Sequence, residues 1–133
     1  MEWHIFIDGA SSGNPGESGA GIIAFDSRGS ELYRDSVYLG HMTNNRAEYE
    51  ALILALERAS KSSVKHVYIY TDSLLVANQV TGKYKIKDLC LLEYVKNAKV
   101  MIERFNSFAL KHIPREKNRI ADKLAKEAAN RKG

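Results

Sequence analysis

The sequence predicts a single α/β domain over residues 1–133, built on a five-stranded mixed sheet flanked by helices. A length of 133 residues suits one domain. Strand-like apolar runs fill the first part of the chain, and helical spacing sets in after Gly40, from where strands and helices alternate. A helix that links two strands usually places them parallel. We therefore expect three opening antiparallel strands followed by two parallel ones.

Three strand patterns open the chain. They are expected over residues 5–9, 19–26 and 31–39, where apolar residues cluster. Gly, Ser, Asn and Pro residues between the strands predict turns over 10–18 and 27–30. The three strands should therefore form a meander joined by hairpins.

Helices dominate the rest of the sequence. Residues 44–60 repeat small and apolar side chains at helical spacing, at Ala47, Ala51, Leu52, Ala55, Leu56 and Ala59. The later elements should be a strand over 64–70, helices over 73–80 and 88–104, a strand over 108–113, a loop over 114–118 and a helix over 119–132. The core-facing residues of the last two helices are expected to be Leu92, Val95, Ala98 and Ile102, then Leu124, Ala125 and Ala128.

The amino-acid composition limits which cellular environments and binding partners are expected for the protein. The formal charge of +4 and pI near 9.2 favour an acidic partner, although many small soluble proteins are mildly basic. Cys90 is the only cysteine, which excludes an internal disulfide, and its apolar neighbours predict a buried structural thiol. No apolar run approaches the roughly 20 residues of a membrane span, and from the composition of the first residues we expect no signal peptide. We expect a cytoplasmic monomer.

Two acidic residues stand at strand ends. Asp8 ends the first strand and Asp72 follows the fourth, and both strands read as buried central strands. If these strands lie side by side in parallel, both carboxylates project from the edge where open α/β sheets bind ligands. Taken singly, Asp8-Gly9 would pass for a turn and Asp72-Ser73 for a helix N-cap.

Two further acids lie on predicted helices. Glu48 falls on the core-facing stripe of its helix, where an unpaired charge costs several kcal/mol and a metal ion would serve as a partner. Asp122 lies in the first turn of the last helix, where the helix dipole alone would stabilise it by roughly 0.3–1 kcal/mol. Two adjacent strand ends together with a core-facing glutamate indicate a site rather than a coincidence.

Such a site offers only hard oxygen ligands, and no Cys/His cluster at zinc spacing occurs in the sequence. Oxygen ligands predict Mg²⁺ or Mn²⁺. Several carboxylates in one cleft suit a pair of ions roughly 4 Å apart, an arrangement that hydrolyses phosphodiesters.

Four motifs resemble those of type 1 ribonuclease H, in the order of that family and over nearly the whole chain. They are residues 8–16 (DGASSGNPG), 43–52 (TNNRAEYEAL), 71–73 (TDS) and 118–125 (NRIADKLA). The resemblance implies a ribonuclease H-like fold and an endoribonuclease that hydrolyses the RNA strand of RNA/DNA hybrids with two metal ions. It also implies a metal-binding and catalytic quartet of Asp8, Glu48, Asp72 and Asp122.

The resemblance also suggests substrate contacts. Asn14, Asn44 and Asn45 resemble the contacts of the family along the minor groove and the backbone, and amides can hydrogen-bond the 2′-hydroxyl that distinguishes RNA. Thr43 and Arg46 resemble residues that hold a phosphate of the DNA strand. The alternatives are a turn at Asn14, a capping pair of Asn44 and Asn45, and a solvated Arg46.

The sequence departs from the family pattern in three places. His112 occupies the place of a mobile histidine that assists catalysis, but the loop after it is short, and Arg115 is an equal candidate for that role. Leu74 replaces a polar groove contact, which Asn78 one turn later would supply. The short segment 81–87 stands in place of a basic protrusion, with Lys83, Tyr84, Lys85 and Lys87 as a reduced substitute or as a solvated loop.

The functional hypotheses follow from these residues. The leading one is the hybrid-specific endoribonuclease, and its alternatives are a nuclease of the same fold with relaxed specificity and a catalytically silent nucleic-acid-binding module. A purely structural acidic cluster is disfavoured, because four carboxylates without a cation would repel one another.

Overall fold

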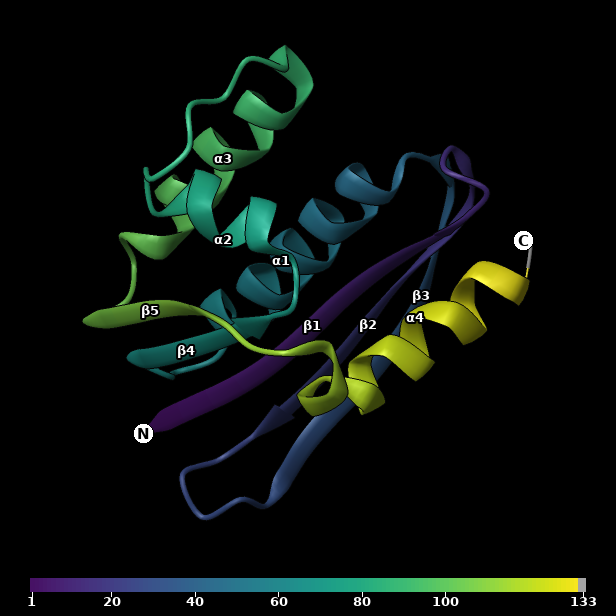
Figure 1. Cartoon of the computed structure of the whole chain (residues 1–133). Helices are drawn as coiled ribbons and strands as arrows, with labels where there is room; N and C mark the ends of the chain where they lie inside the picture. The colour runs from purple at the N-terminus through teal and green to yellow at the C-terminus, as the bar shows by residue number, and fades with distance from the viewer. Residues whose placement is uncertain (132–133) are drawn as a thin grey trace.

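The computed structural model describes residues 1–131, which form a five-stranded sheet in the order β3-β2-β1-β4-β5 (Figure 1). The strands are β1 (Glu2–Ser12), β2 (Gly16–Phe25), β3 (Glu31–Met42), β4 (His66–Thr71) and β5 (Ser107–His112). β1 pairs antiparallel with β2, and β2 with β3, whereas β1 pairs parallel with β4, and β4 with β5. The predicted mixed sheet is therefore confirmed.

Four α-helices and one 3₁₀-helix connect or follow these strands. They are α1 (Asn44–Ser60), α2 (Leu74–Val80), α3 (Leu89–Ile102), η1 (Arg115–Lys117) and α4 (Arg119–Arg131). Side chains of Thr43, Ser73 and Asp88 accept backbone hydrogen bonds at the starts of α1, α2 and α3, which fixes where these helices begin. The helix predictions are correct to within about two residues, and the predicted end at residue 132 lies outside the described range.

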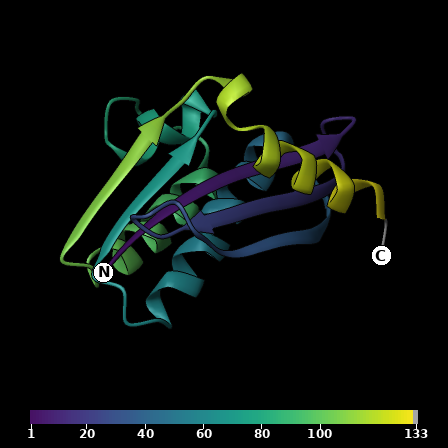
Figure 2. The same cartoon turned by 90° about the horizontal axis from the view of Figure 1, so that it is seen from below.

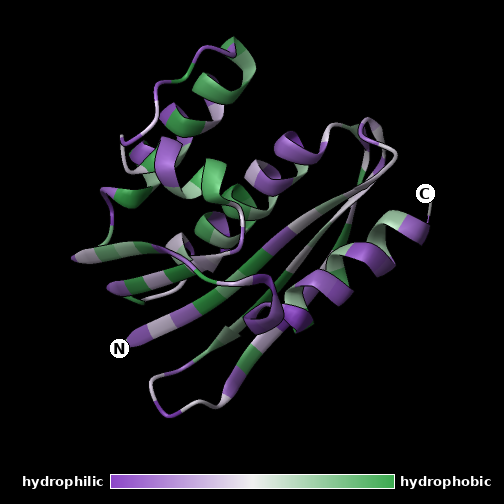
Figure 3. Cartoon of the chain, viewed as in Figure 1, coloured by the Kyte–Doolittle hydropathy of each residue, from purple (hydrophilic) through white to green (hydrophobic). Residues whose placement is uncertain are grey.

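The main core lies between the sheet and α1. Ile5 and Ile7 of β1 and Ile69 of β4 face Leu52 and Leu56 of α1, and all five are at most 1% exposed. Figure 3 shows a hydrophobic stretch in the middle of β1 with hydrophilic residues on either side. α2 and α3 extend this layer, as Figure 1 shows, with Val76 and Val95 among their buried residues.

α4 covers part of the opposite face (Figure 2). Two glycines of β2 let it approach, because a Cβ on Gly19 or Gly21 would lie 2.4 or 2.0 Å from a carbonyl oxygen of α4. Leu124, Ala125 and Ala128 of α4 face this surface, as predicted. The close approach brings the first turn of α4 beside β1.

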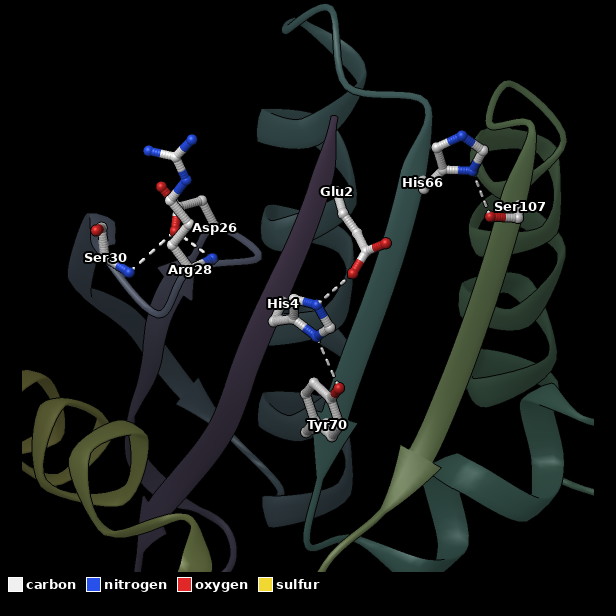
Figure 4. A network of polar contacts seen from close by, with 8 residues as sticks. All are labelled: Glu2, His4, Asp26, Arg28, Ser30, His66, Tyr70 and Ser107. Atoms are coloured by element: carbon white, nitrogen blue, oxygen red, sulfur yellow. Dashed lines mark hydrogen bonds and ion pairs between the residues drawn. The ribbon is translucent and has the colours of Figure 1, made fainter.

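The turn predicted over residues 10–18 is present but shorter, because β1 runs on to Ser12 and β2 begins at Gly16, which leaves residues 13–15 for the turn. The polar composition has a structural reason. Ser11 and Ser18 donate hydrogen bonds to the carbonyl of Met42, and a Cβ on Gly16 would lie 1.8 Å from the Ser12 carbonyl oxygen. Pairing with this longer hairpin also extends β3 to Met42. The second turn is confirmed, with Asp26 Oδ1 accepting hydrogen bonds from the amides of Arg28 and Ser30 (Figure 4).

The predicted burial of Cys90 is wrong. Leu91, Val95 and Ala98 lie on one face of α3 and are buried, and Cys90, one residue before Leu91 and so about 100° around the helix, is exposed. Leu92, one residue after Leu91, is half-buried. Within residues 1–131, no helix has both the length and the apolar character needed to cross a bilayer.

Candidate active site

Asp8 and Asp72 lie at the same edge of the sheet. Ile7 of β1 pairs with Thr71 of β4 in parallel register, and in each case the next residue along the chain is an aspartate. The predicted proximity of Asp8 and Asp72 is confirmed, although Asp8 does not end its strand, because β1 continues to Ser12. The alternative interpretations of these residues are wrong, since Asp8-Gly9 lies inside β1 and Ser73, rather than Asp72, caps α2.

Glu48 of α1 completes an acidic cluster with these two residues. It is 6% exposed, and the backbone N–H of Gly9 donates a hydrogen bond of 2.5 Å to its Oε1. A Cβ on Gly9 would lie 2.2 Å from the backbone of Ala47, so glycine allows this contact between α1 and β1. One carboxylate oxygen each from Asp8, Glu48 and Asp72 lies within 4.8 Å of the others, close enough to hold one metal ion.

Asp122 lines the same pocket from the first turn of α4. The pocket has a volume of about 210 Å³, and all four predicted acids contribute to its wall. Asp122 stands beside the three-residue cluster rather than within it. Lys126 Nζ lies 3.1 Å from its Oδ2 and an Arg115 guanidinium nitrogen lies 3.7 Å from its Oδ1.

The electrostatics separate the buried acids from Asp122. Burial, together with the charges of Glu48 and Asp72, raises the pKa of Asp8 to about 10. Burial likewise raises the pKa of Glu48 to about 7, although the Gly9 amide opposes this. For Asp122 burial acts in the same direction, but its interactions with Asp8 and Lys126 outweigh it and lower the pKa. The interior of the cluster therefore lacks positive charge, which a cation would supply.

Asn118 belongs to the site, although it was not among the predicted site residues. It is 2% exposed, and its Nδ2 donates to the Ile7 carbonyl at 2.8 Å and to Asp72 Oδ2 at 3.1 Å. Its Oδ1 is buried and has no hydrogen-bond partner among residues 1–131. Lys126 was missed too, although its spacing of four residues from Asp122 on a helix could have indicated a contact.

The structure distinguishes the two candidates for an assisting residue. Arg115, in η1, lines the acidic pocket. His112 ends β5 opposite Thr71, is exposed, and is not among the residues that line the pocket.

The predicted substrate residues gather at the start of α1. Thr43 caps this helix by accepting a hydrogen bond from the Arg46 amide, so the predicted capping pair of Asn44 and Asn45 is wrong. Asn14 stands in the turn between β1 and β2 with φ of 31°, and its Oδ1 accepts a 2.8 Å hydrogen bond from the Asn44 amide. Asn44 also lines the acidic pocket, whereas Asn45 and Arg46 are exposed beside it in sequence.

The remaining candidates lie farther along the chain. Leu74 begins α2 and is 49% exposed, and Asn78 is half-buried on the same helix. The polar residues of segment 81–87 are all exposed, and none of them lines the acidic pocket; they are Lys83, Tyr84, Lys85 and Lys87.

Comparison with known proteins identifies close relatives. Residues 6–128 match a family model described as reverse transcriptase-like. Ribonuclease HI of Halobacterium salinarum is 37% identical over 125 residues, which make up 94% of this chain and 63% of that protein. Related mycobacterial proteins are matched over 35% of their length, so the chain spans less than two thirds of these relatives.

Solved structures agree over the whole fold. RNase H1 from Halobacterium salinarum superposes with a TM-score of 0.95 at 35% identity, covering 98% of this chain and 99% of that one. LC11-RNase H1 in complex with an RNA/DNA hybrid superposes with a TM-score of 0.90 at 40% identity, covering 97% of each chain.

Proposed function

The chain belongs to the type 1 ribonuclease H family, and from that premise we propose that it is an endoribonuclease hydrolysing the RNA strand of RNA/DNA hybrids. The observation that carries this proposal is the cluster of Asp8, Glu48 and Asp72, with Asp122 on the wall of the same pocket. The relative solved with a bound RNA/DNA hybrid, at 40% identity, supports the hybrid as substrate.

The proposed cofactor is a pair of Mg²⁺ or Mn²⁺ ions held by Asp8, Glu48, Asp72 and Asp122. The residues fit such ions, because the donors are carboxylate oxygens and the raised pKa values of Asp8 and Glu48 reflect a cluster without a counter-charge. When bound, two such ions activate a water and stabilise the leaving oxygen of a phosphodiester.

The protein itself keeps the carboxylates in place. The Gly9 amide holds Glu48 against β1, and the Asn118 side chain holds Asp72 beside Ile7 of the same strand. Such supporting hydrogen bonds orient metal-binding groups before the substrate arrives. Arg115 and Lys126 bring positive charge to the Asp122 side, where we place the scissile phosphate. We therefore assign the assisting role to Arg115 rather than to His112.

Substrate recognition is assigned to the start of α1 and the turn packed against it. We propose that Thr43 and Arg46 bind a DNA phosphate, since a helix N-terminus favours an anion. Asn14, Asn44 and Asn45 would hydrogen-bond the minor groove, and Asn78 would add a contact from α2. The hydrogen bond between Asn14 and the Asn44 amide supports this assignment, because it holds the two segments together as one surface.

A relaxed-specificity nuclease of the same fold is the second candidate. Leu74 favours it, because this exposed apolar side chain cannot hydrogen-bond a 2′-hydroxyl at the start of α2. A silent nucleic-acid-binding module is disfavoured by the presence of all four acids around one pocket. The cytoplasmic location and the monomeric state stay predictions.

The test is a cleavage assay with end-labelled RNA annealed to DNA. Single-stranded RNA, double-stranded RNA and DNA duplex serve as controls, each with Mg²⁺, Mn²⁺ or a chelator. We expect metal-dependent cleavage confined to the RNA of the hybrid. Cleavage of the control duplexes at a similar rate would favour the relaxed nuclease. Hybrid binding without cleavage in any metal would favour the silent module.

A further inference from the structure

Half of the sheet face that carries Asp8 and Asp72 has no helix above it in the part of the chain that the structure describes. α4 covers this face over β2 and the later part of β1, and the region over β4, β5 and the start of β1 is bare (Figure 2). Side chains alternate along a strand, so Phe6 shares a face of β1 with Asp8. Tyr70 lies two residues before Asp72, which directly follows β4. The bare surface therefore borders the acidic cluster through Phe6 and Tyr70.

A row of stacked rings occupies this bare surface. In order, the rings belong to Tyr68, His4, Tyr70 and Phe6, with successive centroids 4.8, 5.9 and 4.6 Å apart and interplanar angles of 5°, 19° and 18°. Phe25 of β2 meets Phe6 edge-on at 5.9 Å. All five side chains are half-buried, so their remaining surface is open to solvent.

Hydrogen bonds fix the middle of this row. His4 contacts Glu2 Oε1 at 2.9 Å through Nε2 and the Tyr70 hydroxyl at 2.8 Å through Nδ1 (Figure 4). Figure 4 also shows that these side chains project from the bare face of β1 and β4. A row held in this way loses little conformational freedom when a planar ligand packs against it.

Positive charges border the aromatic row. Lys111 of β5 is exposed, and its Nζ lies 5.6 Å from the centre of the Tyr68 ring. At the other end, a hollow of about 310 Å³ is lined by Phe6 and Phe25 together with Lys117 and Arg119. Glu116 is the one carboxylate among the described residues that line the hollow. Cations beside aromatic rings form the combination that binds single-stranded nucleic acid, in which phosphates meet the charges and unpaired bases meet the rings.

We propose that this surface binds a single-stranded segment that continues from the RNA/DNA hybrid. Bases would pack against the aromatic row and in the hollow, and phosphates would lie near Lys111, Lys117 and Arg119. A duplex would not suit the surface, because its bases are already stacked and paired. The inference rests on the proposed function, since the hybrid at the acidic cluster is what brings the strand to this face.

The test measures binding by fluorescence anisotropy in a chelator, so that no cleavage occurs. The probes are a blunt hybrid and four hybrids that each carry a single-stranded extension of about ten nucleotides at a different strand end, a length within the usual site size. We expect at least one extension to tighten binding roughly fivefold or more. Equal affinity for the blunt and all the extended hybrids would overturn the proposal.

Two substitutions test whether the aromatic row and its bordering lysine cause the tighter binding of the extended hybrids. Lys111→Glu and Tyr68→Ala should each remove most of the gain from the extension while leaving the affinity for the blunt hybrid within about twofold. Tyr68→Phe keeps the ring and should retain the gain, and Lys61→Glu, at the far end of α1, is the charge-matched control. A gain that survives both substitutions, or an equal loss on blunt and extended hybrids, would contradict the assignment.

Two further readouts separate this proposal from its alternatives. Metal-dependent cleavage of the blunt hybrid by the Lys111→Glu variant reports on the proposed function alone, so a failure of that function is recognised independently. Sedimentation of wild type and variants reports on self-association. If the substitutions abolish a dimer without changing the gain from the extension, the surface is an interface between two copies and the proposal is wrong.

Discussion

The side-chain amide of Asn118 donates a 3.1 Å hydrogen bond to Asp72 Oδ2 while also donating to the Ile7 carbonyl at 2.8 Å. Asn118 directly precedes α4, so one buried residue links the start of that helix to β1 and to an acid that follows β4. Asp122 is tied to the same residue, because its amide donates to the Asn118 carbonyl at 3.0 Å. The side chain of Asn118 therefore helps to position Asp72, while its backbone carbonyl accepts the first helical hydrogen bond of α4 from Asp122.

Asn118→Ala is expected to lower kcat/KM for hybrid cleavage by roughly 10–100-fold, the usual effect of losing a residue that orients a metal ligand. It should also reduce the free energy of unfolding by about 1–3 kcal/mol, because the Ile7 carbonyl loses a buried partner. Steady-state kinetics and urea denaturation measure the two effects. Asn106→Ala, at an exposed position before β5, is the matched control. Wild-type kinetics in a folded Asn118→Ala protein would contradict the positioning role.

Asp8→Asn should stabilise the metal-free protein, by about 1–3 kcal/mol, because it removes a buried carboxyl that Glu48 and Asp72 repel. Urea denaturation in a chelator measures the change. Glu103→Gln, an exposed change of the same kind, should leave the stability within about 0.5 kcal/mol. A lower stability of Asp8→Asn in the absence of metal would show that the carboxylates of Asp8, Glu48 and Asp72 do not destabilise the folded protein by repelling one another.

The advantage of Asp8→Asn should grow with pH. Burial and neighbouring charges raise the pKa of Asp8 in the folded state to about 10, against 3.8 for the ordinary carboxyl. Proton binding by the folded state thus stabilises the wild type fully below pH 3.8, and this contribution is lost as pH rises through about 10. Glu48, with a pKa raised to about 7, also favours proton binding by the folded state, but it is present in both proteins, so the divergence reports on Asp8. The unfolding free energies of wild type and Asp8→Asn, measured without metal from pH 5 to pH 9, should diverge steadily. A constant difference would contradict the raised pKa.

Arg115→Ala should lower kcat for hybrid cleavage by roughly tenfold or more, because the guanidinium lines the acidic pocket where we place the scissile phosphate. His112→Ala should change kcat by less, since His112 is exposed at the end of β5 and away from the lining residues. Arg115→Lys, which keeps the charge without the planar fork, should fall between wild type and alanine. A larger loss in His112→Ala than in Arg115→Ala would reverse the assignment.

Much of the site follows from local periodicity. Strand patterns that end near Asp8 and Asp72 and a helical stripe through Glu48 are enough to bring three acids together, provided that β1 and β4 are neighbours. The role of Asn118 was not predicted, because it depends on contacts with Asp72 and Ile7. These residues lie 46 and 111 positions away in the sequence, and a local sequence pattern does not reveal such contacts.

The errors have physical causes as well. Glycine and serine in the hairpin between β1 and β2 resemble a turn, yet they are required there by close backbone contacts and by hydrogen bonds to the Met42 carbonyl. Cys90 is exposed because the buried face of α3 runs through Leu91, Val95 and Ala98, and a neighbouring residue on a helix points about 100° away.

We propose that this protein cleaves the RNA strand of a hybrid with divalent metal ions held by the four carboxylates around one pocket. The most direct test of this proposal is single-turnover cleavage of an RNA/DNA hybrid by wild type and Asp8→Asn at saturating enzyme with Mg²⁺ or Mn²⁺, with folding checked by circular dichroism. We predict that wild type cleaves only when metal is present and that the folded variant is slower by at least roughly a thousandfold. Metal-dependent cleavage by Asp8→Asn at the wild-type rate would contradict the proposal.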